Sequence, residues 1–144
     1  MATISAAAVR DLREKTGAGM MDCKKALTET NGDMQKAIDY LREKGIAKAA
    51  KKSGRIAAEG ACAAFVTADG KIGALTEINC ETDFTANNSD FRALVKKITE
   101  HVAKTNPADV DALNASVIEG KKTVADLVTE ATATIGEKIW THCR

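Results

Sequence analysis

The chain has 144 residues and a mass of 15.2 kDa; 44% of the residues are apolar, 28% are charged and the net charge is +1. This size fits one domain or two small ones, and the apolar content is ordinary for a folded soluble protein. No apolar run approaches the ~20 residues that span a bilayer, and residues 1–9 lack the basic start and long apolar stretch of a signal peptide, so we expect a cytoplasmic protein.

Charge is distributed unevenly along the chain. Residues 1–55 hold 12 Lys and Arg against 7 Asp and Glu, a charge of +5, and residues 56–144 hold 9 against 13, a charge of −4. Only Tyr40 is aromatic in the basic part, whereas a surface that stacks on nucleic-acid bases needs more aromatic residues. We therefore expect an acidic protein partner or a solvated face there, and no direct contact with nucleic acid.

The cysteines and histidines do not form a metal-site pattern. They are scattered and contain no CxxC pair, at Cys23, Cys62, Cys80, Cys143, His101 and His142. We expect no metal and no other cofactor. Cys23 and Cys62 are predicted to be small buried apolar residues, and His101, on an apolar helix, to be structural.

The first third of the chain predicts three short helices. Ser5 is a good N-cap, and Ile4 and Val9 are spaced to form a hydrophobic staple. Glycines at 17 and 19 end the first helix, and the second covers residues 20–30. Asp33 caps the third, whose apolar residues recur at helical spacing, and its predicted C-cap is Gly45. Residues 46–55, rich in Lys and Ala, are predicted to be a helical, partly flexible linker.

After residue 55 the pattern changes from helical to alternating. Ala61, Ala63 and Phe65 share one face of a strand, Asp69-Gly70 supplies a hairpin turn, and residues 72–79 return as the partner strand. Helices are predicted from the apolar stripes at residues 91–102 and 123–134, with a short helix around 110–113. The fold class is therefore α+β: a three-helix bundle followed by a small antiparallel hairpin or sheet packed on helices. Two strands alone make a poor sheet: either the chain is part of a longer protein, or Trp140 and its neighbours cover an edge that would otherwise invite pairing.

Sequence motifs of catalysis are missing. The chain holds no phosphate-binding loop, no dinucleotide fingerprint, no HExxH and no nucleophile elbow, so we expect neither an enzyme nor a small-molecule substrate. The informative segment is Thr82-Asp83-Phe84. A large aromatic residue between a strand and a helix either packs into its own core or projects toward a partner, and hydrophobicity alone favours the core.

Two long ordered segments resemble the translation elongation factor Ts family. They are residues 12–27, Leu-Arg-Glu-Lys-Thr-Gly-Ala-Gly-Met-Met-Asp-Cys-Lys-Lys-Ala-Leu, and residues 77–84, Glu-Ile-Asn-Cys-Glu-Thr-Asp-Phe. A third element, Ile135-Gly136-Glu137, has the expected spacing. The resemblance implies a ubiquitin-associated-like module at residues 1–55 and the first core subdomain at 56–144, with the family's second subdomain absent.

The resemblance also implies a function. The chain would be a guanine nucleotide exchange factor that binds elongation factor Tu and promotes GDP release by displacing elements around the nucleotide and magnesium site. The partner-binding residues carried over are Asp83, Phe84, Thr82, Ile135, Gly136, Arg10, Arg13, Met20 and Lys24.

Two rival interpretations stay open at this point. In the first, the three-helix bundle is a ubiquitin-associated-like protein interaction module without exchange activity, and Asp83 and Phe84 are dispensable. In the second, the chain is a thiol enzyme that uses Cys80 beside Glu81. No histidine partner for that cysteine is evident in the sequence.

Overall fold

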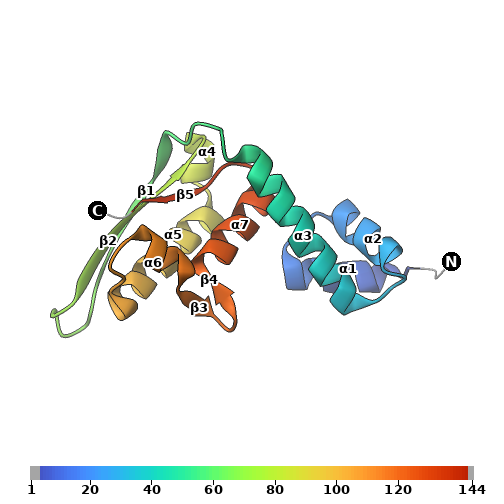
Figure 1. The fold of residues 1–144 in the computed structure, drawn as a ribbon, viewed down its shortest axis with the longest axis horizontal. Coiled ribbons are helices and arrows are strands. Elements are labelled where there is room, and N and C mark those ends of the chain that lie inside the picture. Colours follow the sequence, from blue (N-terminus) through green and yellow to red (C-terminus); the bar gives the residue numbers. More distant parts are fainter. Residues whose placement is uncertain (1–3, 143–144) are drawn as a thin grey trace.

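The computed structural model describes residues 4–142, so Cys143 and the other residues outside this range carry no structural account. Figure 1 shows its arrangement of helices and two small sheets. The fold class is therefore α+β, as the sequence predicts. The elements are α1 (Ala6–Thr16), α2 (Met20–Glu29), α3 (Met34–Lys52), β1 (Glu59–Val66), β2 (Gly73–Cys80), α4 (Asp83–Ala86), α5 (Ser89–Thr105), α6 (Val110–Ala115), β3 (Val117–Glu119), β4 (Lys122–Thr123), α7 (Val124–Ile135) and β5 (Trp140–His142).

The three N-terminal helices surround a small hydrophobic cluster of their own. The Ser5 side chain accepts the Ala8 N–H and caps α1, and Ile4 packs against the same cluster. α1 ends at Gly17, whose φ of +66° favours a residue without a side chain. The buried members of the cluster are Val9, Leu12, Cys23, Ala26, Leu27 and Ala37.

The third helix is longer than the sequence indicates. α3 continues through Gly45 to Lys52, so the predicted C-cap at Gly45 is wrong and residues 46–52 belong to the same helix. Gly45 instead faces α7: a Cβ built on it lies 3.4 Å from the Ala133 Cβ. Two effects continue the helix past Gly45, which by itself would weaken it. The Lys- and Ala-rich stretch that follows has high helix propensity, and Gly45 packs against α7.

The three-stranded sheet has the order β1-β2-β5 and is antiparallel throughout. β1 pairs with β2 from Glu59↔Cys80 to Val66↔Gly73, and Gly70 turns the hairpin with a φ of +70°. β5 pairs along the other edge of β2, with Asn79 opposite Trp140. Trp140 and its neighbours therefore cover one edge of the hairpin, and β2 lies in the centre of the sheet.

One face of the sheet is covered by α5, and a second hydrophobic cluster fills the space between them. Its largest fully buried side chains are Phe91, Ile78, Ile98 and Leu113. A buried hydrogen bond of 2.5 Å joins the hydroxyls of Thr76 in β2 and Thr99 in α5. His101 is buried, and its Nε2 lies 2.7 Å from the Ser116 hydroxyl. Burial lowers the pKa of His101, and its position agrees with the predicted structural role.

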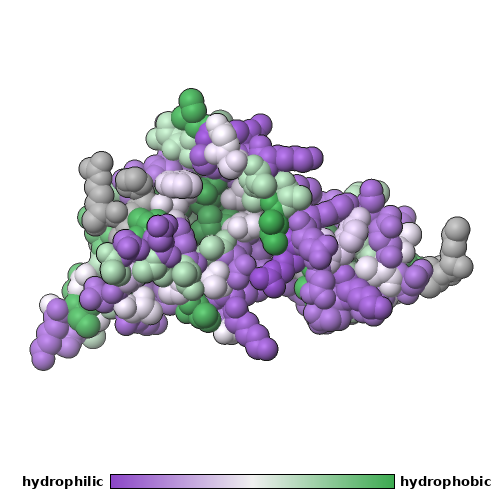
Figure 2. Space-filling model, in the orientation of Figure 1, coloured by the Kyte–Doolittle hydropathy of each residue, from purple (hydrophilic) through white to green (hydrophobic). Residues whose placement is uncertain are grey.

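The surface also differs between the two parts of the chain. Figure 2 shows hydrophilic residues over most of the face that α1, α2 and α3 present, and apolar patches over the part with the sheet. Among the described residues, no helix combines the length and the apolar character that crossing a membrane requires.

Gly45 provides a test of the packing between α3 and α7. Gly45→Ala is expected to raise the free energy of unfolding by about 0.5–1 kcal/mol, because alanine favours the helix and its Cβ reaches Ala133 only at contact distance. Gly45→Leu is expected to lower it, because the longer side chain collides with α7. Urea unfolding of both variants measures the difference; stabilisation by leucine contradicts the close approach.

Candidate functional site

The site is built on a single helical turn between the sheet and α5. Thr82 is the N-cap of α4, and its hydroxyl oxygen accepts the Thr85 N–H at 3.4 Å. The Asp83 carboxylate accepts the N–H of Phe84 at 3.0 Å, and the Asp83 carbonyl accepts the N–H of Asn87 at 3.0 Å. Within the turn, the backbone N–H groups of residues 84, 85 and 87 are therefore bonded to Thr82 or Asp83.

Phe84 points away from the protein. Its side chain is 84% exposed, so the preference for core packing that hydrophobicity gives is wrong. The reason is the geometry of the turn: Thr85 and Ala86 occupy its buried side, and Asp83 and Phe84 are left on the solvent side. The outward direction that the family resemblance implies for this aromatic is the one observed.

A single carboxylate anchors the start of this turn. Glu137 Oε2 accepts the backbone N–H groups of Glu81 and Thr82, both at 3.1 Å, and Oε1 accepts the Thr82 hydroxyl at 2.6 Å. The Gly136 φ of +86° ends α7 and turns the chain toward residues 81–82. Thr82, Ile135 and Gly136, three of the predicted site residues, are thus brought together with Asp83 and Phe84. The predicted site residues do not include Glu137, although it belongs to the Ile135-Gly136-Glu137 element, which was the available signal.

The anchoring is reciprocal. Glu81 Oε1 accepts the N–H of Lys138 at 2.6 Å, so each of the two segments gives a carboxylate to the backbone of the other. The guanidinium of Arg55 lies 3.2 Å from both Glu81 oxygens. Lys138 Nζ donates to the carbonyls of Ser53 and Arg55, and Lys52 Nζ donates to the Gly136 carbonyl. These bonds tie the end of α3 to the same site.

The environment of Glu137 sets its protonation. Burial alone acts to raise the pKa, but the hydrogen bonds from Thr82 and from the backbone of Glu81 outweigh it and hold the pKa of Glu137 below its ordinary value. Glu137 is therefore ionised at neutral pH, and its bonds to the turn are charge-assisted.

The remaining predicted residues lie elsewhere. Arg10 and Arg13 are on α1, Met20 and Lys24 are on α2, and all four are exposed. Met20 is 42% exposed and the adjacent Met21 is 74% exposed, so both methionines face solvent. Figure 1 shows that α1 and α2 lie toward one end of α3 and α4 toward the other. The structure therefore gives two separate groups of candidate contact residues.

Cys80, the cysteine of the thiol-enzyme interpretation, gives no support to thiol chemistry. Cys80 is fully buried, its thiol donates to the Thr82 carbonyl at 3.2 Å, and burial raises its pKa, so a thiolate is disfavoured. Cys23 is buried as predicted, whereas Cys62 is exposed on the uncovered face of β1, so that prediction is wrong. No group of three potential metal ligands is present within residues 4–142.

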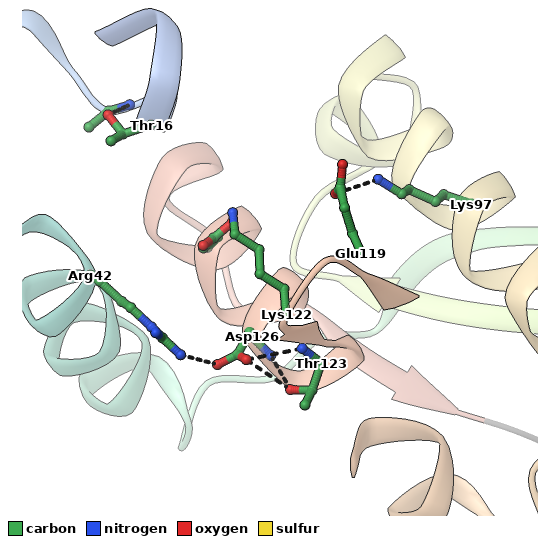
Figure 3. A network of polar contacts seen from close by, with 9 residues as sticks. Thr16, Arg42, Lys97, Glu119, Lys122, Thr123 and Asp126 are labelled. Carbon is green, nitrogen blue, oxygen red and sulfur yellow. Dashed lines mark hydrogen bonds and ion pairs between the residues drawn. The ribbon is translucent and has the colours of Figure 1, made fainter. Parts of the chain in front are cut away.

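A cleft of about 760 Å³ lies between the α1–α2 turn, α3, the β3–β4 turn and α7. Figure 3 shows polar contacts of residues that line it: Arg42 reaches Asp126 at 3.1 Å, Asp126 also accepts from Thr123 behind it, and Glu119 pairs with Lys97 outside the cleft at 2.7 Å. Hydrogen bonds from Thr123 and Arg42 hold the pKa of Asp126 low, and the Lys97 ammonium does the same for Glu119. Such paired carboxylates are poor general acids or bases.

The charge of Glu137 leads to a pH-dependent prediction. Because its pKa is lowered in the fold, its contribution is present above the ordinary value of 4.5 and is lost as the pH falls through the lower folded value. Glu137→Gln is expected to reduce the free energy of unfolding at pH 7 by about 1–2 kcal/mol. Thermal unfolding from pH 7 to pH 3 should show the gap between variant and wild type closing below 4.5. A constant gap across this range contradicts the role of the ionised carboxylate.

Comparisons with known proteins relate the sequence of this chain to a family. The family model described as Elongation factor TS matches residues 81–142, the part that contains α4, α7 and Glu137. The proteins named Elongation factor Ts from three strains of Clostridium perfringens are each 56% identical over 136 residues, which is 94% of this chain and 45% of the relative. The chain therefore spans about half the length of the curated relatives it matches, and over that span it belongs to the elongation factor Ts family.

Proposed function

We propose that the chain is a guanine nucleotide exchange factor of translation elongation, which binds elongation factor Tu and promotes the release of GDP. The relatives that it matches are named Elongation factor Ts. The observation that carries the proposal is Phe84: a large aromatic side chain, 84% exposed, on a turn whose preceding two residues donate three hydrogen bonds to the Glu137 carboxylate. The cytoplasm, where translation takes place, is the expected compartment.

An exposed aromatic on an anchored turn is suited to binding work. Burying a side chain of this size in a partner gains about 2–3 kcal/mol relative to leaving it in water. Since the turn is already ordered, little of this gain is lost in fixing it on binding. Asp83 beside it adds a negative charge to the same exposed surface. In the proposed complex, Asp83 and Phe84 enter the nucleotide-binding part of the GTPase, and the neighbouring Ile135 and Gly136 contact it close by.

Exchange requires that this binding energy depend on the nucleotide. A factor that binds nucleotide-free Tu more tightly than the GDP-bound form weakens GDP binding by the same factor, because coupling between two ligands is reciprocal. Phe84 would act as a wedge and meet this requirement if the pocket that receives it in Tu is open only when the nucleotide site of Tu is deformed. A coupling of about 2.7 kcal/mol then corresponds to a hundredfold change in GDP affinity.

The two hydrophobic clusters support a division of the chain into two structural units. One cluster belongs to α1, α2 and α3, and the other to the sheet with α5, α6 and α7. We propose that residues 1–55 form a ubiquitin-associated-like module and residues 56–144 the first core subdomain of the family. Arg10, Arg13, Met20 and Lys24 then provide a second, basic contact to Tu.

The proposal is tested by the release of a fluorescent GDP analogue from Tu. Wild-type chain is expected to accelerate release, and Phe84→Ala is expected to lower that acceleration at least about tenfold, because a buried aromatic anchor is removed. The melting temperature should hardly change, since Phe84 is 84% exposed in the free chain.

Leu75→Ala is the matched control. Leu75 is another large apolar residue, 66% exposed, but it lies on β2 away from the turn. It should leave release unchanged. If the chain binds Tu and accelerates release equally well without the Phe84 ring, the wedge is refuted. If it binds without any acceleration, the interaction module without exchange activity becomes the better description.

A further inference from the structure

The direction of Phe84 depends on how the short helix α4 is held in place. α4 has four residues, and a single helical turn is not stable by itself because nucleating a helix is unfavourable. Phe84, 84% exposed, also gains little from packing on its own chain. The turn is fixed by its two buried residues, Thr85 and Ala86, and by hydrogen bonds to its backbone, and the hydrogen bonds from a distant segment converge at its start.

The contacts that converge there come from Glu137. One carboxylate receives two backbone N–H groups at 3.1 Å and the Thr82 hydroxyl at 2.6 Å, all within the two residues that precede Asp83. The donors, Glu81 and Thr82, directly follow β2, and the acceptor directly follows α7. The bonds therefore join residues that are 55 or 56 positions apart in the sequence. The strand end that leads into the turn is therefore held by a distant segment, in addition to the local hydrogen bonds within the turn.

The Thr82 hydroxyl links this anchor to the helix. Its single proton is donated to Glu137, which leaves its oxygen lone pairs free to accept the Thr85 N–H at 3.4 Å. Donation to a carboxylate polarises the hydroxyl and strengthens it as an acceptor. The carboxylate therefore acts on the N-cap of α4 as well as on the strand end before it.

We propose that Glu137 is a positioning residue for nucleotide exchange, which acts by holding Thr82 and thereby directing Phe84. The inference rests on the proposed exchange function and adds to it the residue on which the direction of the wedge depends. Glu137 itself need not touch the GTPase. Its loss releases the turn, so that part of the binding energy of the ring is consumed in ordering it again.

The test is a double-mutant cycle on the release of the fluorescent GDP analogue. Glu137→Ala is expected to lower the acceleration about tenfold, in line with the loss of charge-assisted hydrogen bonds. Glu137→Gln should lie between wild type and alanine, because its amide oxygen still accepts from the backbone. In the Phe84→Ala background, Glu137→Ala should change the remaining rate less than about twofold, since the two residues act as one unit.

Asp109→Ala is the control for a general loss of stability. The Asp109 carboxylate caps α6 by accepting the Ala112 N–H at 2.7 Å, remote in sequence from α4. It should cost stability without lowering release at a temperature where both variants are folded. If Glu137→Ala lowers release equally in the wild-type and Phe84→Ala backgrounds, or if Asp109→Ala has the same effect, the positioning role is refuted.

Amide hydrogen exchange of the free chain separates this inference from the proposed function. Glu137→Ala should speed exchange at residues 81–87 at least about tenfold while leaving α5 unchanged, because only the turn loses its anchor. A fast-exchanging turn in a chain that fails to release GDP refutes the proposed function alone. An unchanged turn refutes the positioning role, whatever the chain does to Tu.

Discussion

The arrangement around α4 depends on two carboxylates, each of which accepts hydrogen bonds from the backbone of the segment that carries the other. Glu137 accepts backbone N–H groups from residues 81 and 82, and Glu81 accepts the N–H of Lys138. The two segments leave β2 and α7, which are far apart in the sequence, and neither has regular structure at this point. Carboxylates are well suited to join such ends because each can accept several donors at once. Phe84 can stay exposed because its backbone is held by polar bonds and not by its ring.

The end of α3 is part of the same construction. Lys52 and Arg55 bind Gly136 and Glu81, and the Lys138 ammonium binds carbonyls at the end of the helix. The Arg55–Glu81 ion pair and the Lys138 hydrogen bonds are exposed, where a single such contact adds little to stability. Together they fix a direction: the helix that leaves the first hydrophobic cluster is fastened to the segment that presents Phe84.

Much of the fold could be predicted because periodicity reports local burial. Helical stripes located α1, α2, α5 and α7, and alternation located the β1–β2 hairpin. The same alternation could have corrected Cys62, since Ala61 and Ala63 face the core and the residue between them must face outward. Gly45 could not be predicted in this way, because Ala133 decides its role. Glu137 was missed for the same reason: its partners are more than 50 residues away.

The continuity of α3 has a consequence for how sequences of this kind can vary. An α-helix turns about 100° and rises about 1.5 Å with each residue. A one-residue insertion or deletion between Gly45 and Lys52 would therefore swing α1 and α2 around the helix axis by more than a quarter turn, even though every local contact in both clusters could survive. Loops elsewhere can accommodate a change in length. The number of residues in this helix, in contrast, sets the angle between the surface of α1 and α2 and the surface that carries Phe84, so that number is itself a structural constraint.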